Sequence, residues 1–226
     1  MARTWLSEED SRLVAEAVAA AEANSAGEIV TIVTDRSDGY MDVALAWSLI
    51  VAFLALAVFS SFPGFVLGKI DWLLGSWRIE WTLREALTIA LGLAVLKFAA
   101  MMLLQLIQPL KFWLIPPPIK SARVNDRAVE FFRVGAERRT TGRTGILIYL
   151  SMREHRAEIV ADEAIASQVE PEVWGKAMEA MLGHIKDGRV GHGLAAAIGE
   201  VGKVLAAHVP RQADDVNELP DRPIEI

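Results

Sequence analysis

The sequence predicts an α/β fold, an αβα sandwich with a small mixed sheet, interrupted by a transmembrane helical hairpin. Strand-like segments alternate with helix-like segments on both sides of two long apolar stretches, a pattern that places helices over a sheet. We therefore divide the chain into a first helix and strand, an inserted hairpin, the remainder of the same domain and an extended tail. These segments are residues 1–42, 43–110, 111–210 and 211–226.

The composition fits a soluble domain joined to a small membrane part. Of the 226 residues, 53% are hydrophobic, which is high for a soluble domain. The net charge of −6 argues against a nucleic-acid partner. The chain has no cysteine, which excludes disulfides, thiol catalysis and cysteine metal sites.

Two apolar stretches are each long enough to cross a membrane as a helix. Val43–Gly68 contains no charged side chain, and Ala86–Leu110 contains only Lys97. A helix needs about 20 apolar residues to cross a bilayer core of about 30 Å. Buried core helices are the alternative, but helices in globular proteins average about 11–12 residues, so we favour membrane spans. Tryptophans mark the expected interfaces. They are Trp47, Trp72, Trp77, Trp81 and Trp113.

Charged residues near the hairpin predict its orientation. Basic residues favour the cytoplasmic side, and the outer flanks hold more of them than the loop, so we expect the soluble parts on the cytoplasmic side of a bacterial inner membrane. Lys97 lies within the second span, where a lysine costs about 2.5–3.5 kcal/mol. We interpret it as a snorkelling side chain or as a sign that the span is shifted along the sequence. The flanks carry Arg36, Lys111, Lys120, Arg123 and Arg127, and the loop carries Lys69, Arg78 and Arg84.

The segments around the hairpin predict a sheet with helices on both faces. A helix that starts at a capping box of Ser7 and Asp10 leads to a strand at Glu28–Thr34, whose adjacent apolar pairs indicate burial on both faces. A strand at Ile146–Leu150 follows a helical crossover, so we expect it to lie parallel beside the first. Further predicted elements are a stiff spacer at Pro116–Pro118, a helix at 121–138, a turn at 152–155, an antiparallel edge strand at Arg156–Ala161, and helices at 164–169, 171–186 and 191–208.

Several of these segments resemble the TPM domain family. The run from Thr141 to Asp162 resembles the strand–turn–strand centre of that domain, and Gly27–Val33 is similar to its first strand. Asn217–Pro223 resembles a tail found in a membrane-bound bacterial branch of the family. Similar positions in the closing helices are Trp174, Gly188, Gly193, Ala197 and Ile198.

The resemblance implies an αβα sandwich and a modest range of activities. Members include thylakoid proteins linked to photosystem repair, a receptor auxiliary subunit and bacterial membrane proteins. Some are described as weak acid phosphatases and some as calcium binders. The family often has Asp-Asn-Gly before the second strand, where this chain has Arg143-Thr144-Gly145 and so exchanges an acid for a cation.

Two rims of the predicted sheet collect the candidate site residues. At the carboxyl ends of the parallel strands, Asp35, Asp38 and Glu154 are candidate ligands for Ca²⁺ or members of a solvated polar rim. The opposite rim, where the resemblance places the family's functional residues, is a candidate anion- or partner-binding site. Alternatively, Arg143 simply pairs with Asp162 there. The residues of this second rim are Thr141, Arg143, Thr144, Asp162 and Glu163.

Two functions remain open at the level of sequence. It contains no phosphate-binding Gly-Lys-Ser loop, no Gly-x-Ser-x-Gly elbow and no His-Glu-x-x-His motif. We therefore expect a membrane-anchored binding, assembly or maintenance module for a membrane complex, with the lipid bilayer and a membrane protein as partners. The alternative, which the resemblance suggests, is a weak Ca²⁺- or Mg²⁺-dependent acid phosphatase.

Overall fold

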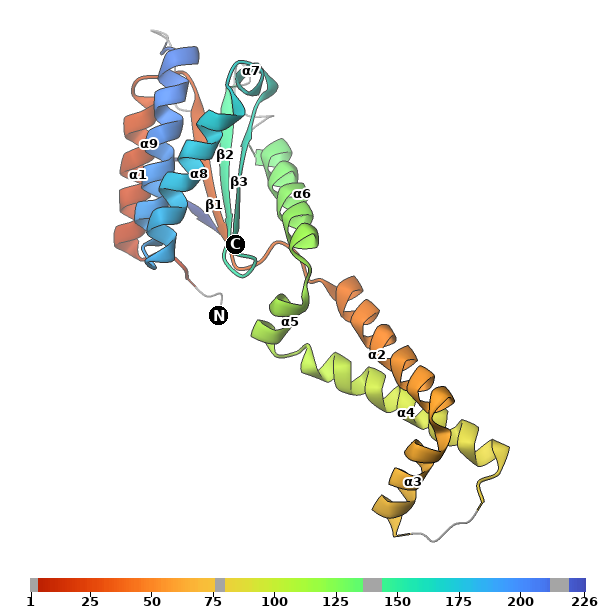
Figure 1. The fold of residues 1–226 in the computed structure, drawn as a ribbon. Helices are drawn as coiled ribbons and strands as arrows, with labels where there is room; N and C mark the ends of the chain where they lie inside the picture. The colour runs from red at the N-terminus through yellow and green to blue at the C-terminus, as the bar shows by residue number, and fades with distance from the viewer. Residues whose placement is uncertain (1–3, 76–79, 136–143, 212–219) are drawn as a thin grey trace. The chain divides into compact units, whose positions relative to one another are not determined.

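A computed structural model describes residues 4–75, 80–135, 144–211 and 220–226 of the chain (Figure 1). The chain forms two compact units. We call the first the sheet unit, which consists of Met1–Asp38 together with Pro117–Ile226. The second is the hairpin unit, Gly39–Pro116, which is inserted between the two parts of the sheet unit.

The sheet unit is built on four strands in the order β3-β2-β1-β4. β1 and β2 are parallel, with a register that runs from Glu28 opposite Gly145 to Thr34 opposite Ser151. β3 is antiparallel to β2 and β4 is parallel to β1, so the sheet is mixed. The predicted parallel neighbours and the predicted antiparallel edge strand are thereby confirmed. The strands are β1 (Glu28–Thr34), β2 (Gly145–Ser151), β3 (Arg156–Ala161) and β4 (Ile224–Glu225).

One face of the sheet is covered by three helices and holds the larger core (Figure 1). Alternate residues of the two central strands point to this face, including Ile29 and Val33 of β1 and Ile148 of β2. They pack against fully buried side chains of the helices, such as Val14 and Leu194. The helices are α1 (Glu8–Glu22), α8 (Pro171–Lys186) and α9 (Val190–His208).

The other face is covered by a single helix, α6 (Pro117–Gly135). The intervening strand residues, among them Ile32 and Leu147, pack here against Val124 and Ala128 of α6. Both central strands are buried along their whole length, as expected of strands that are covered on both faces. The αβα sandwich predicted from the sequence is therefore confirmed.

Capping and proline positions explain where several helices begin. The Asp10 amide donates to Ser7 Oγ at 3.0 Å and the Ser7 amide donates to Asp10 Oδ2 at 3.1 Å, which confirms the predicted capping box of α1. Pro171 lies in the first turn of α8, as predicted. The short helix α7 (Glu163–Ala166) is shorter than the helix expected over 164–169.

The predicted proline spacer is wrong. Pro117 is the first residue of α6, and this helix ends at Gly135 within the described residues instead of covering 121–138. A proline in the first turn of a helix loses no hydrogen bond, because the first amides of a helix have no partner within it, and its fixed φ suits the helix. Three consecutive prolines therefore end one helix and begin the next without an extended spacer.

The described residues of the hairpin unit form four helices where two long ones were predicted. The first apolar stretch breaks at Phe62, and Pro63 begins a separate helix, because a proline inside a helix removes a hydrogen bond and clashes with the preceding turn. The second stretch ends as a helix at Leu104 and not at Leu110, with Pro109 in the first turn of the next helix. The helices are α2 (Met41–Ser61), α3 (Pro63–Leu74), α4 (Leu83–Leu104) and α5 (Gln108–Leu114).

Polar contacts join α2 to the end of α4. The side-chain amide of Gln105 donates to the carbonyl oxygen of Ala44 at 3.0 Å, and lies 3.4 Å from Ser48 Oγ. Ser48 and Gln105 are buried, with 0% and 5% of their surfaces exposed. Nearby, the Tyr40 and Phe112 rings meet edge to face at 5.8 Å. The inner side of the hairpin is therefore packed, and the Ser48 hydroxyl and the Gln105 amide group are hydrogen-bonded there.

The outer side of the hairpin is apolar and exposed. α2 and α4 are both long and apolar enough to cross a membrane. Phe53 and Leu54 of α2 expose 66% and 61% of their surfaces, and Leu91 of α4 exposes 65%. Large exposed apolar surfaces of this kind mark sites of contact with lipid or with another protein.

Candidate functional site

A buried polar cluster lies at the carboxyl ends of β1 and β2. Glu154, in the turn after β2, is 2% exposed. Its Oε1 accepts a hydrogen bond from the Ser37 amide at 2.8 Å, and its Oε2 accepts one from the Ser151 hydroxyl. Charged groups are costly to bury unless they are hydrogen-bonded, and here both carboxylate oxygens are. We call this arrangement the Glu154 latch, because it fastens the chain after β1 to the turn after β2.

Tyr149 extends the latch under α6. Its hydroxyl lies 3.0 Å from Ser37 Oγ, and its ring stacks on Phe131 of α6 at 5.9 Å between centroids. Burial raises the pKa of the Tyr149 phenol, and the hydrogen bond with Ser37 partly offsets that rise. The phenol is therefore kept neutral around neutral pH, as a hydrogen-bonding member of the cluster.

The other predicted calcium ligands at this rim are held by arginines. Asp35 Oδ2 accepts from Arg153 Nε at 2.7 Å, and Asp38 Oδ2 lies 3.4 Å from Arg123 Nε. The structure does bring Asp35, Asp38 and Glu154 to one rim, as the parallel pairing predicts.

These carboxylates do not fit a calcium site. Calcium takes six to eight oxygen ligands, whereas both Glu154 oxygens accept protein hydrogen bonds and each aspartate faces an arginine. Among the described residues, no three His, Asp or Glu side chains lie close enough together to hold a metal ion. One oxygen, Asp35 Oδ1, is buried without a hydrogen-bond partner, but a single oxygen does not make a calcium site. We assign no metal chemistry to this rim.

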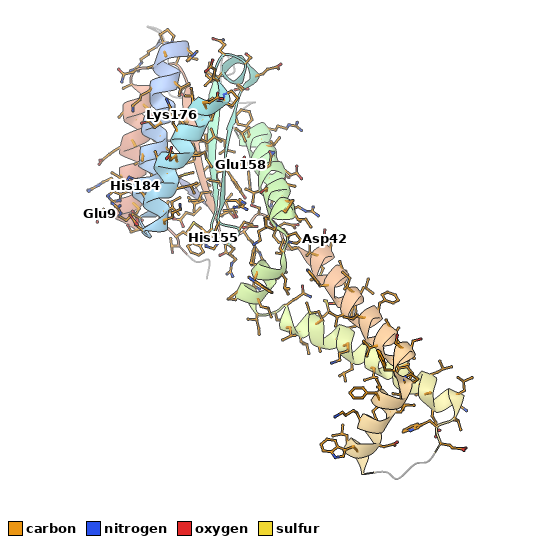
Figure 2. The ribbon with its side chains drawn as sticks, in the orientation of Figure 1. Glu9, Asp42, His155, Glu158, Lys176 and His184 are labelled. Atoms are coloured by element: carbon orange, nitrogen blue, oxygen red, sulfur yellow. The ribbon has the colours of Figure 1, made fainter. Side chains whose placement is uncertain are left out.

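Titratable side chains near this part of the sheet include His155, in the turn after β2, and Glu158, on β3 (Figure 2). Burial, and then the charge of Arg156, lower the pKa of Lys120. Burial raises the pKa of Glu158 on β3, and the Arg156 guanidinium partly offsets that rise. His155 lies exposed at the tip of the turn with φ at 51°, in the left-handed region that non-glycine residues seldom occupy.

At the opposite rim, the Asp162 side chain accepts a hydrogen bond from the backbone of β2. Its Oδ2 accepts from the Gly145 amide at 2.9 Å, and its own amide donates to the Gly145 carbonyl at 3.0 Å. The Thr144 hydroxyl donates to the Ala26 carbonyl oxygen at 2.8 Å. Both side chains therefore fasten the start of β2. Thr141 and Arg143, the other predicted members of this rim, lie outside the described residues, so the predicted Arg143–Asp162 pair stays a prediction.

A cavity of about 460 Å³ opens beside Asp162, between α6 and the end of β3. Its polar lining comes from Asp162, Glu163 and Ser167 on one side and Arg133 of α6 on the other. Phe132 and Val160 contribute to its apolar wall. One cation facing two carboxylates and a hydroxyl can bind a polar ligand or a partner's side chain.

Sequence reasoning found the predicted rim residues that the structure describes but missed several of their neighbours. Ser37 and Tyr149 were not predicted to touch, because they lie 112 residues apart in the sequence. Arg133 and Ser167 were not predicted at the cavity, because only the packing of α6 against β3 brings them there. A tyrosine within an otherwise aliphatic buried strand was the available signal, since a buried phenol usually finds a hydrogen-bond partner.

The fold and the two rims define an α/β sandwich interrupted by an apolar hairpin. Residues 114–204 match the model of the TPM domain. The NMR structure of BA42 protein from the psychrophilic bacterium Bizionia argentinensis is similar over 99% of this chain and 97% of that chain, with a TM-score of 0.56 and 18% sequence identity. At that identity the similarity concerns the fold alone. A comparison with curated proteins finds no match. Residues 114–204 are therefore similar to the TPM domain, and the fold of the chain is similar to that of BA42 protein.

We predict that the Glu154 latch stabilises the sheet unit. Glu154→Ala leaves the Ser37 amide without an acceptor and should lower the free energy of unfolding by about 1–3 kcal/mol. Glu154→Gln should lose less, because the amide oxygen still accepts from Ser37 and its NH₂ group can donate to Ser151. Urea unfolding followed by circular dichroism in detergent measures both. Exposed Glu179 on α8 provides the control, and equal losses for Glu154→Ala and Glu179→Ala would contradict the latch.

We predict that Tyr149 ionises above the ordinary tyrosine value of about 10. The folded state then favours the neutral phenol, so its contribution to stability is complete below the unfolded pKa and is lost as pH rises through the folded pKa. The chain has two tyrosines, so tyrosinate absorbance of a Tyr40→Phe variant reports Tyr149 alone. Adding Ser37→Ala should raise the midpoint further. The denatured variant gives the reference midpoint, and a native midpoint at or below it would refute the assignment.

Proposed function

We propose that the protein is a membrane-anchored TPM-domain module that binds, assembles or maintains a membrane-protein complex, and that its hairpin spans a bacterial inner membrane. The observation that carries the proposal is the apolar outer surface of α2 and α4. Leu49 and Val95, one from each helix, expose 48% and 60% of their surfaces. Burial of apolar surface stabilises a protein by about 25 cal/mol for each square ångström removed from water. Side chains that stayed exposed to water would not contribute this free energy.

The dimensions and the helix ends support membrane insertion. α2 and α4 contain 21 and 22 residues, which at a rise of 1.5 Å gives about 32 Å, close to the thickness of a bilayer core. Indole groups that bond to polar atoms lie near both ends of the hairpin. Trp47 Nε1 donates to the Leu114 carbonyl at 3.1 Å, and Trp81 Nε1 donates to Asp71 Oδ2 at 3.2 Å. An indole with a polar contact suits the membrane interface.

The basic residues of the flanks support a cytoplasmic location of the sheet unit. Lys111 donates to the Gly39 carbonyl at 2.5 Å, at the end of the hairpin unit that continues into the sheet unit. Arg123 and Arg127 follow as the seventh and eleventh residues of α6. Lysine and arginine close to the ends of spans favour the cytoplasmic side.

The connection between β1 and α2 supports a role at the membrane. Only residues 35–40 separate the two elements along the chain, and the Glu154 latch holds Ser37 within that link. The rim of the sheet is therefore tethered by a short, ordered segment to a hairpin that we place in the bilayer. A domain tethered in this way meets membrane proteins more often than freely diffusing solutes.

We predict that the chain stays with membranes after alkaline washing. Leu49→Glu together with Phe53→Glu should release it, because each charge within a span costs about 2.5–3.5 kcal/mol. Immunoblots of pellet and supernatant measure the distribution. Leu182→Glu, at a position 37% exposed on α8, is the control and should stay in the pellet. Recovery of the unaltered chain in the supernatant would overturn the anchoring, and purification in mild detergent that yields only this chain would argue against a stable complex.

The cavity beside Asp162 favours one second candidate, a weak metal-dependent acid phosphatase. Arg133 offers a cation for a phosphate group, and Asp162 and Glu163 offer carboxylates next to it. Asp162 would have to combine that role with its bond to the Gly145 amide.

A phosphatase would hydrolyse a generic phosphate ester in the presence of Ca²⁺ or Mg²⁺. If the cavity is the site, Arg133→Gln should lower the rate about tenfold or more, because a charged contact to phosphate is lost. Release of inorganic phosphate by the purified full chain in detergent measures it. The control is Arg12→Gln, on the exposed side of α1. Activity that survives Asp162→Asn combined with Asp35→Asn would point to a contaminant or to another site.

A further inference from the structure

Lys97 is the one charged residue in the interior of the two long apolar helices. Its side chain is exposed on α4. The acidic residues of these helices lie at their starts, where Asp42 belongs to the first turn of α2 and Glu85 caps its own helix by accepting from Thr82. In α3, Asp71 accepts from Trp81. The described part of the hairpin unit therefore places no carboxylate beside Lys97.

The depth of Lys97 follows from the packing of the hairpin. Gln105, eight residues after Lys97, bonds to Ala44 and Ser48, and so lies level with the turn of α2 that contains Trp47. At 1.5 Å for each residue, Lys97 lies about 12 Å deeper than that level. In the other direction, thirteen residues or about 20 Å separate it from Arg84 at the start of α4.

Snorkelling does not satisfy a lysine at this depth. The four-carbon stem of lysine places its ammonium roughly 6 Å from the helix backbone, about half the distance to the level of Trp47. Charged side chains at such a depth in membrane proteins face a protein interior and pair with one another. The side chains one turn away from Lys97 on α4 offer no oxygen or nitrogen acceptor, since they are Leu93, Ala94, Ala100 and Met101.

We propose that Lys97 is the contact point for a transmembrane helix of another protein that carries an aspartate or glutamate at matching depth. A second copy of this chain does not fit, because it presents only another lysine there. Opposite charge identifies the partner's chemistry, and an ion pair removes the cost of an isolated ammonium in lipid. The inference rests on the proposed membrane insertion and names the residue through which the hairpin recognises its complex.

The test uses the full chain in phosphatidylcholine vesicles together with a synthetic transmembrane helix. The helix carries a dansyl group and one aspartate at mid-span, and a matched helix has leucine in its place. Energy transfer from the tryptophans of the hairpin unit to dansyl measures association. We expect the aspartate helix to bind about tenfold more tightly than the leucine helix, and Lys97→Leu to abolish that difference.

A charge-shifted control separates the position of the lysine from its charge. Leu91→Lys combined with Lys97→Leu moves the lysine to another face of α4, and should not restore the preference. Flotation of the chain with the vesicles tests insertion on its own, so a failure of the membrane proposal is recognised separately. Equal binding of both helices by an inserted chain, in neutral vesicles or in vesicles with anionic lipid, would overturn the inference and assign Lys97 to lipid phosphates.

Discussion

The parallel pairing of β1 with β2 is the constraint on which the rest of the structure depends. The two strands are neighbours in the sheet, although the hairpin unit and α6 lie between them in sequence. All seven residues of each strand are buried, so the pairing stabilises both cores at once. The entropy of closing a loop grows only slowly with its length, so a long insertion is compatible with this pairing. The chain therefore leaves the sheet after β1 and returns through α6.

The polar groups at the carboxyl ends of the strands stabilise the pairing of β1 with β2. Glu154 and Ser37 join the ends of β2 and β1, and Asp35 and Arg153 pair across the same gap. The half-buried Asp35–Arg153 pair is partly screened by solvent, whereas the loss of the buried Glu154 bonds would leave donors unsatisfied. Asp35 and Glu154, which the sequence suggests as metal ligands, thus accept hydrogen bonds from the protein itself. The cavity beside Asp162 lies at the other end of the sheet and does not share these contacts.

The sequence-based predictions succeeded where the signal is local and periodic. The adjacent apolar pairs within β1 and the capping box of Ser7 are read from neighbouring residues, and both appear as predicted. Tertiary contacts such as Ser37 with Tyr149 escaped, since nothing in either segment specifies its partner. The prolines misled for a physical reason: Pro117 and Pro63 begin helices, because the first turn tolerates a residue without an amide proton. Hydropathy alone identified the apolar stretch Val43–Gly68, but it did not identify the break between α2 and α3 at Phe62.

The hairpin contains buried polar residues, which are hydrogen-bonded, and one exposed lysine in the interior of α4. Ser48 and Gln105 are buried and bond to each other and to backbone carbonyls, so the inner side needs no partner. Lys97 is exposed, and the described hairpin gives it no carboxylate. In the bilayer that we propose for the hairpin, a leucine at that position would insert more favourably, by about 2.5–3.5 kcal/mol. The proposed contact of Lys97 with an acidic residue of another protein would offset that cost.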